Sequence, residues 1–460
     1  MKMPVTPPNA EDIFVDMIAK DSTKATGILS KFSPVDTKGR YLHWDKIQHL
    51  ESPEGYSNKE WWAGIKFSRS SMYQTIPLMG KYGKPFKFCV PNNLQEELHW
   101  LDLNTAGTIS AEKPIANPNI RNTYLIRSLV EEAISSSQLE GASTTRNVAK
   151  EMIRQGRDPK DKSEQMIMNN YHAMQFIREY KDEKLTPSIV LELHRIVTES
   201  TLDDGEKAGC FRDADEDIHV VDESHNVLHT PPDASELEDR LKVLCQFANG
   251  ELTEDFLHPV IKAIVLHFML AYDHPFVDGN GRTARALFYW ALANQDYWLM
   301  EFISISKVIK RAPVQYGKAF LHTETDDNDL TYFIVHQLEV IKLSIVELQA
   351  YFDEKIKGVE FAESLLETNN KLKGKLNFRQ LALLRHALKN PRFIYNIIEH
   401  QNSHGIAYET ARNIIYKMSE RVNQKLASGL FGESSEANIC GFSVVITLPV
   451  KRILLNFSLN

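Results

Sequence analysis

The sequence lacks the features that would place it among secreted, membrane or disulfide-stabilised proteins. Its 460 residues include only four cysteines, which are far apart and form no CxxC pair. That argues against a disulfide framework or a zinc site and favours a reducing compartment. No apolar run is long enough to span a bilayer, and the N-terminus has no apolar segment typical of a secretory signal. We therefore expect a cytoplasmic protein without a membrane partner.

An excess of positive charge is also missing. The formal net charge is −8 at pH 7, which argues against broad electrostatic binding to nucleic acid but leaves a local basic patch open. With 43% hydrophobic and 25% charged residues the composition is globular, and the length predicts two or three domains. In the aromatic-rich first hundred residues, we expect Trp44, Trp61 and Trp62 to anchor a core.

Helical periodicity begins near residue 120. Apolar residues recur every three or four positions up to Gly141, which is a suitable helix end. Further helices are expected over about 164–180, 187–200, 234–248 and 258–273. The last of these is apolar nearly all round, so it should be a buried central helix. Two β-branched runs around a polar turn predict a β-hairpin over about 218–232.

The C-terminal part has the outline of a helix-turn-helix. A long helical stretch after about residue 340 precedes three short helical segments at 377–390, 393–402 and 403–419. The residues expected to supply strands of a wing are Val444, Val445, Ile446 and Leu448, and those expected to project from the recognition helix are Tyr408, Arg412 and Lys417. Because few basic residues are present, a partner-docking or dimerising module and a DNA-reading module are both open.

Polar residues are concentrated in the stretch AYDHPFVDGNGRTARALFYW (271–290), between two apolar segments. Gly279 and Gly281 permit backbone conformations in which successive N–H groups converge on an anion at a helix N-terminus. Arg282 and Arg285 are three positions apart, so they share a helix face and can grip phosphate oxygens. Asn280 adds a side-chain donor. These residue types at this spacing predict a polyphosphate site.

Two further groups in the stretch give the site its chemistry. Asp278 is an oxygen ligand suited to Mg²⁺, and His274 is the only group of the loop that readily exchanges a proton near neutral pH. The lysine of a P-loop and the preceding strand of a Rossmann fingerprint are both missing. A turn followed by surface arginines would explain neither the histidine nor the acid.

The segment HPFVDGNGRTAR resembles the signature of the Fic family, His-x-Phe-x-Asp/Glu-Gly-Asn-Gly-Arg-x-x-Arg, at every defined position. The resemblance covers about residues 120–340. It implies a mainly α fold, in which a Fic helical bundle with a β-hairpin flap follows an N-terminal α+β region and precedes a C-terminal winged-helix-like domain. The domains expected on this basis are 1–105, 106–340 and 341–460.

Most Fic enzymes move AMP from ATP to a protein hydroxyl, so the resemblance implies ATP as substrate, Mg²⁺ as cofactor and a hydroxyl-bearing target protein. It implies that His274 is the base and that Asp278 holds Mg²⁺. The ATP-binding residues that it implies are Gly279, Asn280, Gly281, Arg282, Thr283, Ala284, Arg285, Val221 and Tyr316. Val221 belongs to the expected flap, and for Tyr316 an ordinary packing role is equally open.

The segment SSSQLEG (135–141) resembles the inhibitory motif of the family, Ser/Thr-x-x-x-Glu-Gly/Asn, through Ser136, Glu140 and Gly141. The resemblance implies that Glu140 pairs with Arg285 and occupies room that the γ-phosphate needs. It places the chain in the class with an N-terminal inhibitory helix. The alternative is a plain helix end with solvent-facing polar residues.

Several alternatives to an autoinhibited AMP transferase stay open. The chain could transfer another nucleotide or a phosphate, or remove AMP. It could also be a nucleotide-binding transcriptional regulator or adaptor that uses its helix-turn-helix. His219, His225 and His229 suggest either a metal site or exposed positions of a hairpin, and His267 is expected to be a hydrogen-bonded core residue. A homodimer is open as well, since Fic proteins often dimerise.

Overall fold

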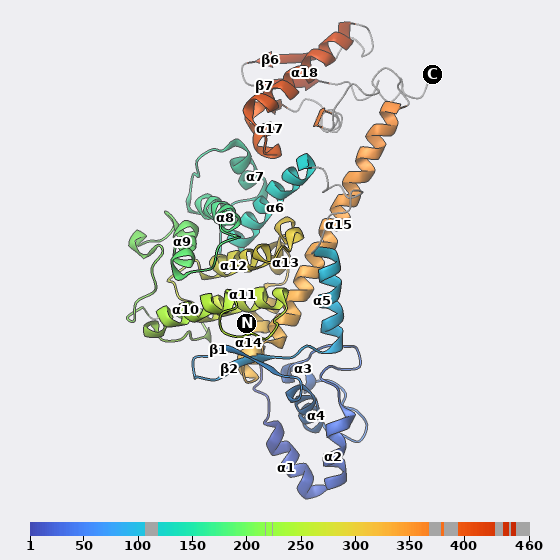
Figure 1. The fold of residues 1–460 in the computed structure, drawn as a ribbon, viewed down its shortest axis with the longest axis vertical. Coiled ribbons are helices and arrows are strands. Elements are labelled where there is room, and N and C mark those ends of the chain that lie inside the picture. Colours follow the sequence, from blue (N-terminus) through green and yellow to red (C-terminus); the bar gives the residue numbers. More distant parts are fainter. Residues whose placement is uncertain are drawn as a thin grey trace. The chain divides into compact units, whose positions relative to one another are not determined.

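The computed structural model describes residues 1–105, 118–216, 218–222, 224–367, 379–380, 394–427, 436–440 and 443–447 (Figure 1). The fold is mainly α-helical, which confirms the expected fold class. The chain divides into two compact units. The described residues of the first unit are 1–105, 131–144, 160–216, 218–222 and 224–345, and those of the second are 118–130, 145–159 and the described residues after 345.

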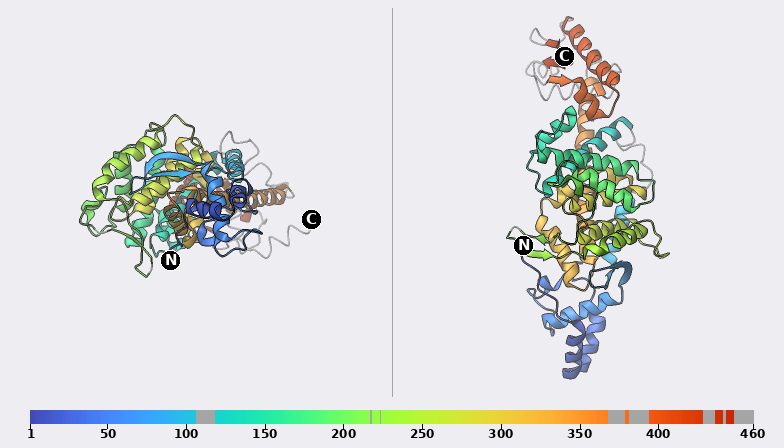
Figure 2. Two further views of the ribbon diagram at one scale, coloured as in Figure 1. Left: turned by 90° about the horizontal axis from the view of Figure 1, so that it is seen from below. Right: turned by 90° about the vertical axis from the view of Figure 1, so that its left-hand side faces the viewer.

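The first hundred residues form a group of helices and a β-hairpin within the first unit. The elements are α1 (Ala10–Lys20), α2 (Ser22–Lys31), α3 (Trp44–Ile47), α4 (Asn58–Ser70), β1 (Gln74–Met79), β2 (Pro85–Phe88) and α5 (Asn92–Thr105). Helices α1, α2 and α4, drawn in blue in Figure 2, pack against one another. Ser57 and Glu60 form a capping box that fixes the start of α4. Trp44, Trp61 and Trp62 are buried in one cluster, as expected from the sequence.

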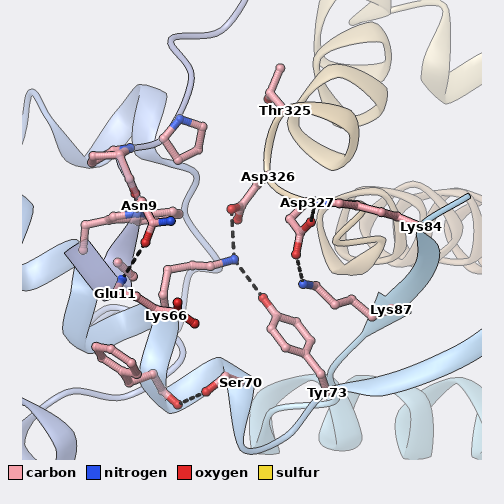
Figure 3. Close-up of a pocket in the computed structure, with 15 residues that line it drawn as sticks. Asn9, Glu11, Lys66, Ser70, Tyr73, Lys84, Lys87, Thr325, Asp326 and Asp327 are labelled. Carbon is pink, nitrogen blue, oxygen red and sulfur yellow. Dashed lines mark hydrogen bonds and ion pairs between the residues drawn. The ribbon is translucent and has the colours of Figure 1, made fainter. Parts of the chain in front are cut away.

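A pocket of about 480 Å³ lies between this N-terminal group and the residues that follow α14 (Pro313–Thr325) (Figure 3). Its charged side chains form ion pairs: Lys66 donates to Asp326 at 2.9 Å, and Lys87 donates to Asp327. None of the site residues expected from the sequence lines this pocket. The ion pairs of Lys66, Lys84 and Lys87 in its lining join the N-terminal group to the helical bundle.

The rest of the first unit is a helical bundle around α11. Its elements are the end of α6 (Pro118–Leu139), α8 (Lys162–Glu179), α9 (Pro187–Thr198), η2 (Gly205–Lys207), η3 (Ala234–Glu236), α10 (Leu237–Ala248), α11 (Pro259–Asp273), α12 (Asn280–Asn294), η4 (Trp298–Phe302), α13 (Ile305–Ile309), α14 and the start of α15 (Thr331–Glu367). Helices α8 to α11 confirm the four helices expected between residues 164 and 273. Helix α11 is buried on nearly all sides, with Pro259 in its first turn, and lies beside α12 (Figure 1).

The expected β-hairpin is present, with short paired strands. β3 (Val220–Val221) pairs antiparallel with β4 (Val227–His229). The His229 ring is buried, with Nδ1 2.8 Å from a carboxylate oxygen of Glu324 and Nε2 2.7 Å from the Tyr272 carbonyl oxygen. These partners give His229 a structural role. Within the described residues, no cluster of three or more His, Cys, Asp or Glu side chains is arranged to hold a metal ion.

The second unit contains the C-terminal helices and a small sheet. Its elements include α7 (Arg146–Gln155), α17 (Ile397–His404), α18 (Tyr408–Ala427) and an antiparallel sheet in the order β5 (Ile394–Asn396), β7 (Ser443–Thr447) and β6 (Glu436–Cys440). Gly405, with φ 56°, makes the turn between α17 and α18. The expectation of a helix over the whole of 393–402 is wrong, because Ile394–Asn396 pair with β7 as a strand.

Parts of the helix-turn-helix expectation lie outside the described residues. These parts are Leu448 and all of 377–390 except residues 379–380. Val444, Val445 and Ile446 lie in β7, so the expected strand is confirmed for them. Arg412 and Lys417 are exposed on α18, as expected of the recognition helix, and Tyr408 is partly buried. The winged-helix assignment and the division into three domains stay predictions.

No helix, over the residues whose structure is described, combines the length and the apolar character needed to cross a lipid bilayer. Cys89, Cys210 and Cys245 are free thiols.

Trp62→Ala tests the core of the N-terminal group. Trp62 is fully buried, and its Nε1 donates to the Pro8 carbonyl at 3.1 Å. Because the substitution leaves a large cavity, we expect the free energy of unfolding to fall by about 3–5 kcal/mol, measured by urea denaturation. The control is Tyr82→Ala, because Tyr82 is 84% exposed. This substitution should change the free energy of unfolding by less than about 0.5 kcal/mol. Equal losses in the two variants would contradict the assignment of this core.

Candidate active site

His274 follows the last residue of α11 and caps that helix. Its backbone is left-handed, with φ 45° and ψ 55°, and its N–H donates to the Leu270 carbonyl. The ring Nδ1 lies 3.3 Å from the Ala271 carbonyl oxygen, which makes Nδ1 the protonated nitrogen and leaves Nε2 as an acceptor. Burial lowers the pKa of His274 to about 4. The imidazole is therefore neutral at pH 7 and able to take up a proton.

The loop after His274 is fixed by two side chains of the loop and of α12. Phe276 is fully buried. The Asn280 side chain accepts from the Phe276 N–H at 3.0 Å and donates to the Phe276 carbonyl at 2.8 Å. The amide that the sequence suggested as a phosphate donor is thus committed to the loop backbone. The amide keeps a second N–H, but the residue is only 3% exposed, so we expect contact of Asn280 with an anion to come mainly from its backbone N–H at the start of α12.

The two glycines of the loop serve different purposes. Gly279 has φ 84°, a conformation that side chains rarely adopt, and a Cβ there would lie 2.7 Å from Cγ2 of Thr198. Gly281 has an ordinary helical backbone in α12, so the expectation that it supplies backbone freedom is wrong. Its missing Cβ makes space instead: an added Cβ would lie 2.1 Å from Oε1 of Glu140 and 3.0 Å from Nη1 of Arg285.

Arg282 is completely buried in the first turn of α12. One guanidinium nitrogen, Nη1, donates to the Val197 carbonyl at 3.0 Å, and another, Nη2, lies 3.3 Å from Oδ2 of Asp278. Its Nε has no hydrogen-bond partner among the described residues. Burial lowers the pKa of Arg282, and the nearby Asp278 carboxylate opposes that shift. A buried cation with an unused N–H is a ready anion-binding group.

Arg285 lies one turn further along α12, and the structure joins it to the segment that resembles the inhibitory motif. Its Nε donates to the Ser136 hydroxyl at 2.9 Å, and its Nη2 donates to the Ser136 carbonyl at 3.1 Å and to Oε1 of Glu140 at 2.8 Å. Burial acts to lower the pKa of Arg285, but Glu140, Tyr316 and Glu132 together outweigh it and the pKa is raised. Gly141, with φ 92°, turns the chain away directly after Glu140.

Asp278 is the exposed acid of the loop. Its side chain is 49% exposed, with Oδ1 accepting from the Gly279 N–H at 2.5 Å and Oδ2 facing Arg282. One accessible carboxylate cannot enclose a metal ion alone. It does fit Mg²⁺, which keeps several waters and is commonly held by one or two carboxylates together with substrate phosphates.

The remaining expected residues lie in different surroundings. Thr283 and Ala284 are fully buried in α12, where the Thr283 hydroxyl donates to the Gly279 carbonyl at 2.9 Å. Val221 is 45% exposed on β3. Tyr316 lies near Arg285, and its hydroxyl is 2.9 Å from Nε2 of His267, a fully buried residue of α11. That contact agrees with the expected core role of His267, while nucleotide contacts of Val221 and Tyr316 stay predictions.

Two residues hold the loop from outside it, through contacts that sequence reasoning did not predict. His194 of α9 stacks on Phe276 with ring centroids 3.7 Å apart, and its Nε2 lies 2.9 Å from the Asp278 carbonyl oxygen. The Gly209 N–H donates to its Nδ1 at 3.0 Å, so Nε2 is the protonated nitrogen. Arg212 donates from Nε to the His274 carbonyl at 3.0 Å. The only signal in the sequence was the segment GCFRD, which marks Arg212 but not its contact.

Residues 184–292 match the model of the Fic/DOC family. This stretch contains the whole loop, both arginines of α12 and the two outside residues. The chain therefore contains a Fic domain. Its Fic domain, as matched, starts after Gly141, so the segment with Ser136 and Glu140 precedes it.

The curated relatives share the Fic domain with this chain. A protein adenylyltransferase Fic from Nematostella vectensis is 36% identical over 109 residues, which cover 23% of this chain and 22% of that protein. A protein adenylyltransferase Fic from Drosophila willistoni is 34% identical over 127 residues, which cover 27% of this chain and 23% of that protein. The chain thus spans less than a quarter of the length of either relative. A solved Fic family protein from Desulfovibrio desulfuricans G20 is 17% identical, with a TM-score of 0.45, covering 77% of this chain and 94% of that one.

The different purposes of the two glycines in the Fic loop can be measured. Gly279→Ala imposes a left-handed backbone on a side chain and brings its Cβ against Thr198. We expect it to lower the free energy of unfolding by about 1–3 kcal/mol. Gly281→Ala keeps a helical backbone and meets the movable end of the Glu140 side chain. We expect a change of less than about 1 kcal/mol, because alanine is favoured in helices. Denaturation curves decide, and a larger loss for Gly281→Ala would contradict this assignment.

Proposed function

We propose that this chain is an autoinhibited protein adenylyltransferase, which moves AMP from ATP to a Ser, Thr or Tyr hydroxyl of a protein, itself included, and releases pyrophosphate. The observation that carries the proposal is one tight loop with a neutral imidazole, His274, at one end and two buried guanidinium groups, Arg282 and Arg285, at the other. The match of residues 184–292 to the Fic/DOC family model and the curated relatives named protein adenylyltransferase support it.

In the proposed reaction, the hydroxyl oxygen of the target forms a bond to the α-phosphorus while the bond from that phosphorus to the pyrophosphate oxygen breaks. The hydroxyl proton passes to Nε2 of His274, whose lowered pKa keeps it unprotonated before the reaction. The negative charge of the phosphates is met by the N-terminus of α12 and by the unused N–H of Arg282. Positioning and charge neutralisation supply most of the catalysis in such transfers.

Asp278 would hold Mg²⁺, which when bound neutralises charge on the phosphates. The carboxylate is half-exposed, and its Oδ2 lies 3.3 Å from Nη2 of Arg282, so the proposed metal ligand and a proposed phosphate-binding group are neighbours.

Glu140 is proposed to keep the activity low. It occupies the guanidinium of Arg285, the group to which the γ-phosphate of ATP would bind. A carboxylate at 2.8 Å from a buried guanidinium makes a charge-assisted hydrogen bond, which is stronger than a neutral one. ATP therefore has to displace Glu140, or bind with its phosphate tail away from Arg285 and its α-phosphorus out of line.

Glu140→Gly is expected to raise AMP transfer by about 10- to 100-fold, the free energy of one charge-assisted hydrogen bond expressed as a rate. The measurement is incorporation of label from ATP radiolabelled at the α-phosphate, with the modified residues mapped by mass spectrometry. Glu183→Gly, which removes an exposed glutamate elsewhere, is the matched control and should leave transfer unchanged. Adding His274→Ala to Glu140→Gly should lower transfer by about 10²- to 10⁴-fold. Equal labelling of wild type and Glu140→Gly would count against autoinhibition.

The lowered pKa of His274 predicts how the activity depends on pH. A base whose pKa is depressed to about 4 stays neutral from alkaline pH down to that value, and is lost as the pH falls through it. In the Glu140→Gly background the acid limb of kcat/KM, which reports the free enzyme, should therefore lie well below the ordinary histidine value of 6.5. Removing Glu140 does not raise it, because this carboxylate acts to increase the pKa. An acid limb at or above 6.5 would contradict the role of His274.

The alternative of a transcriptional regulator rests on the second unit, where α17 and α18 carry the exposed Arg412 and Lys417. DNA binding and a homodimer stay predictions from the sequence.

A further inference from the structure

Arg212 contacts both the catalytic loop and the end of the flap. It lies before β3 and is 8% exposed. Its Nε donates to the His274 carbonyl at 3.0 Å, and its backbone N–H donates to the Pro275 carbonyl at 2.9 Å. Its Nη2 donates to the carbonyl of Pro232, which follows β4. One guanidinium therefore bonds to the backbone of His274 and to the backbone at the far end of the flap hairpin.

Arg212 therefore links the two ends of the segment that contains the flap hairpin. The hairpin of β3 and β4 begins after Arg212 in the chain and ends at Pro232, whose carbonyl accepts from that side chain. A displacement of the hairpin moves the backbone of Arg212, the Pro232 carbonyl, or both. Because the guanidinium is planar and its N–H groups have a fixed spacing, such a displacement is transmitted to the His274 carbonyl.

His274 needs such a support because its backbone is strained. A left-handed conformation costs a non-glycine residue about 1–2 kcal/mol, and it persists only where surrounding contacts determine it. Three contacts do so here: the N–H to Leu270, Nδ1 with Ala271, and the carbonyl with Arg212. The first two lie within α11 itself. Only the contact with Arg212 comes from another segment of the chain.

We infer that Arg212 is a positioning residue, which holds the backbone of His274 in place and couples that position to the flap. The inference rests on the proposed function and deepens it, since it couples the position of the base to the hairpin of β3 and β4, the expected flap. A lysine at this position has one nitrogen and cannot bond to two carbonyl groups in a fixed plane. Charge and geometry at Arg212 are therefore separable by substitution.

The charge of Arg212 has its own effect on His274. Burial is the main cause of the lowered pKa of His274, and His229 of β4 and Arg212 lower this pKa further. The Ala271 carbonyl and Glu140 act to raise it. Loss of the charge at Arg212 should therefore raise the pKa of His274 toward its ordinary value of 6.5. Arg212→Lys keeps the charge and should leave this pKa where it is, so the pKa reports the charge while kcat reports the geometry.

The experiment compares Arg212→Lys and Arg212→Gln, each in the Glu140→Gly background, through kcat, the KM for ATP and the pH profile. Arg212→Lys should lower kcat by about 10- to 100-fold, with the KM for ATP and the acid limb unchanged. Arg212→Gln should lower kcat similarly and move the acid limb toward higher pH. The control is Arg178→Gln on α8, which breaks the ion pair with Glu301. It should leave kcat, the KM for ATP and the pH profile unchanged. Thermal denaturation accompanies each variant, so that rates are referred to folded protein.

Full kcat in Arg212→Lys, or an unmoved acid limb in Arg212→Gln, would overturn the inference. Failure of the proposed function is a separate result, seen as absence of AMP transfer in the Glu140→Gly parent itself. The His274 titration, followed by NMR of ¹³C-labelled histidine rings, then decides the inference without any activity. A pKa raised by Arg212→Gln but not by Arg212→Lys supports it, and identical titrations in all variants overturn it.

Discussion

Burial of two guanidinium groups in the first turns of α12 is the constraint on which the site depends. A buried cation is costly unless anionic or carbonyl partners surround it. Arg285 has a full set, from Ser136 and Glu140. Arg282 has a carbonyl and a half-exposed carboxylate, and its Nε is left without a partner among the described residues. Because of this difference, Arg282 can accept an added anion directly. An anion that binds Arg285 has to compete with Glu140.

The loop that faces these arginines owes its shape to residues distant in the sequence. His194 lies 84 positions before Asp278, whose carbonyl it contacts, and Arg212 lies 62 positions before His274. Neither contact involves a reacting atom. Together they bind backbone groups that the loop cannot satisfy itself, and so permit a conformation that a free loop would not hold. The chemistry of the signature is local, while its geometry depends on α9 and on the segment before the flap.

The sequence was most informative where residue type and spacing alone decide the outcome. Arg282 and Arg285 are three apart, so a shared face follows from helix geometry, and the contact of Arg285 with Glu140 matched the pattern of the inhibitory motif. Prediction from the sequence failed where one residue type can serve two structural roles. Gly281 serves by its missing Cβ rather than by its backbone, and the Asn280 amide binds the loop rather than facing outward. His194 carried no signal, because a histidine on an apolar helix resembles an ordinary core residue.

The space left by Gly281 links autoinhibition to substrate binding in the proposed function. Oε1 of Glu140 reaches into the volume that a Cβ of residue 281 would fill, against the first turn of α12 and beside Arg285. A carboxylate oxygen and a phosphate oxygen are both acceptors of the size and charge that a helix N-terminus and a guanidinium bind best. A surface shaped for one therefore accepts the other. In the proposed function the segment with Glu140 inhibits by supplying an anion to Arg285, so that Glu140 has to be displaced before the phosphate tail of ATP binds in line.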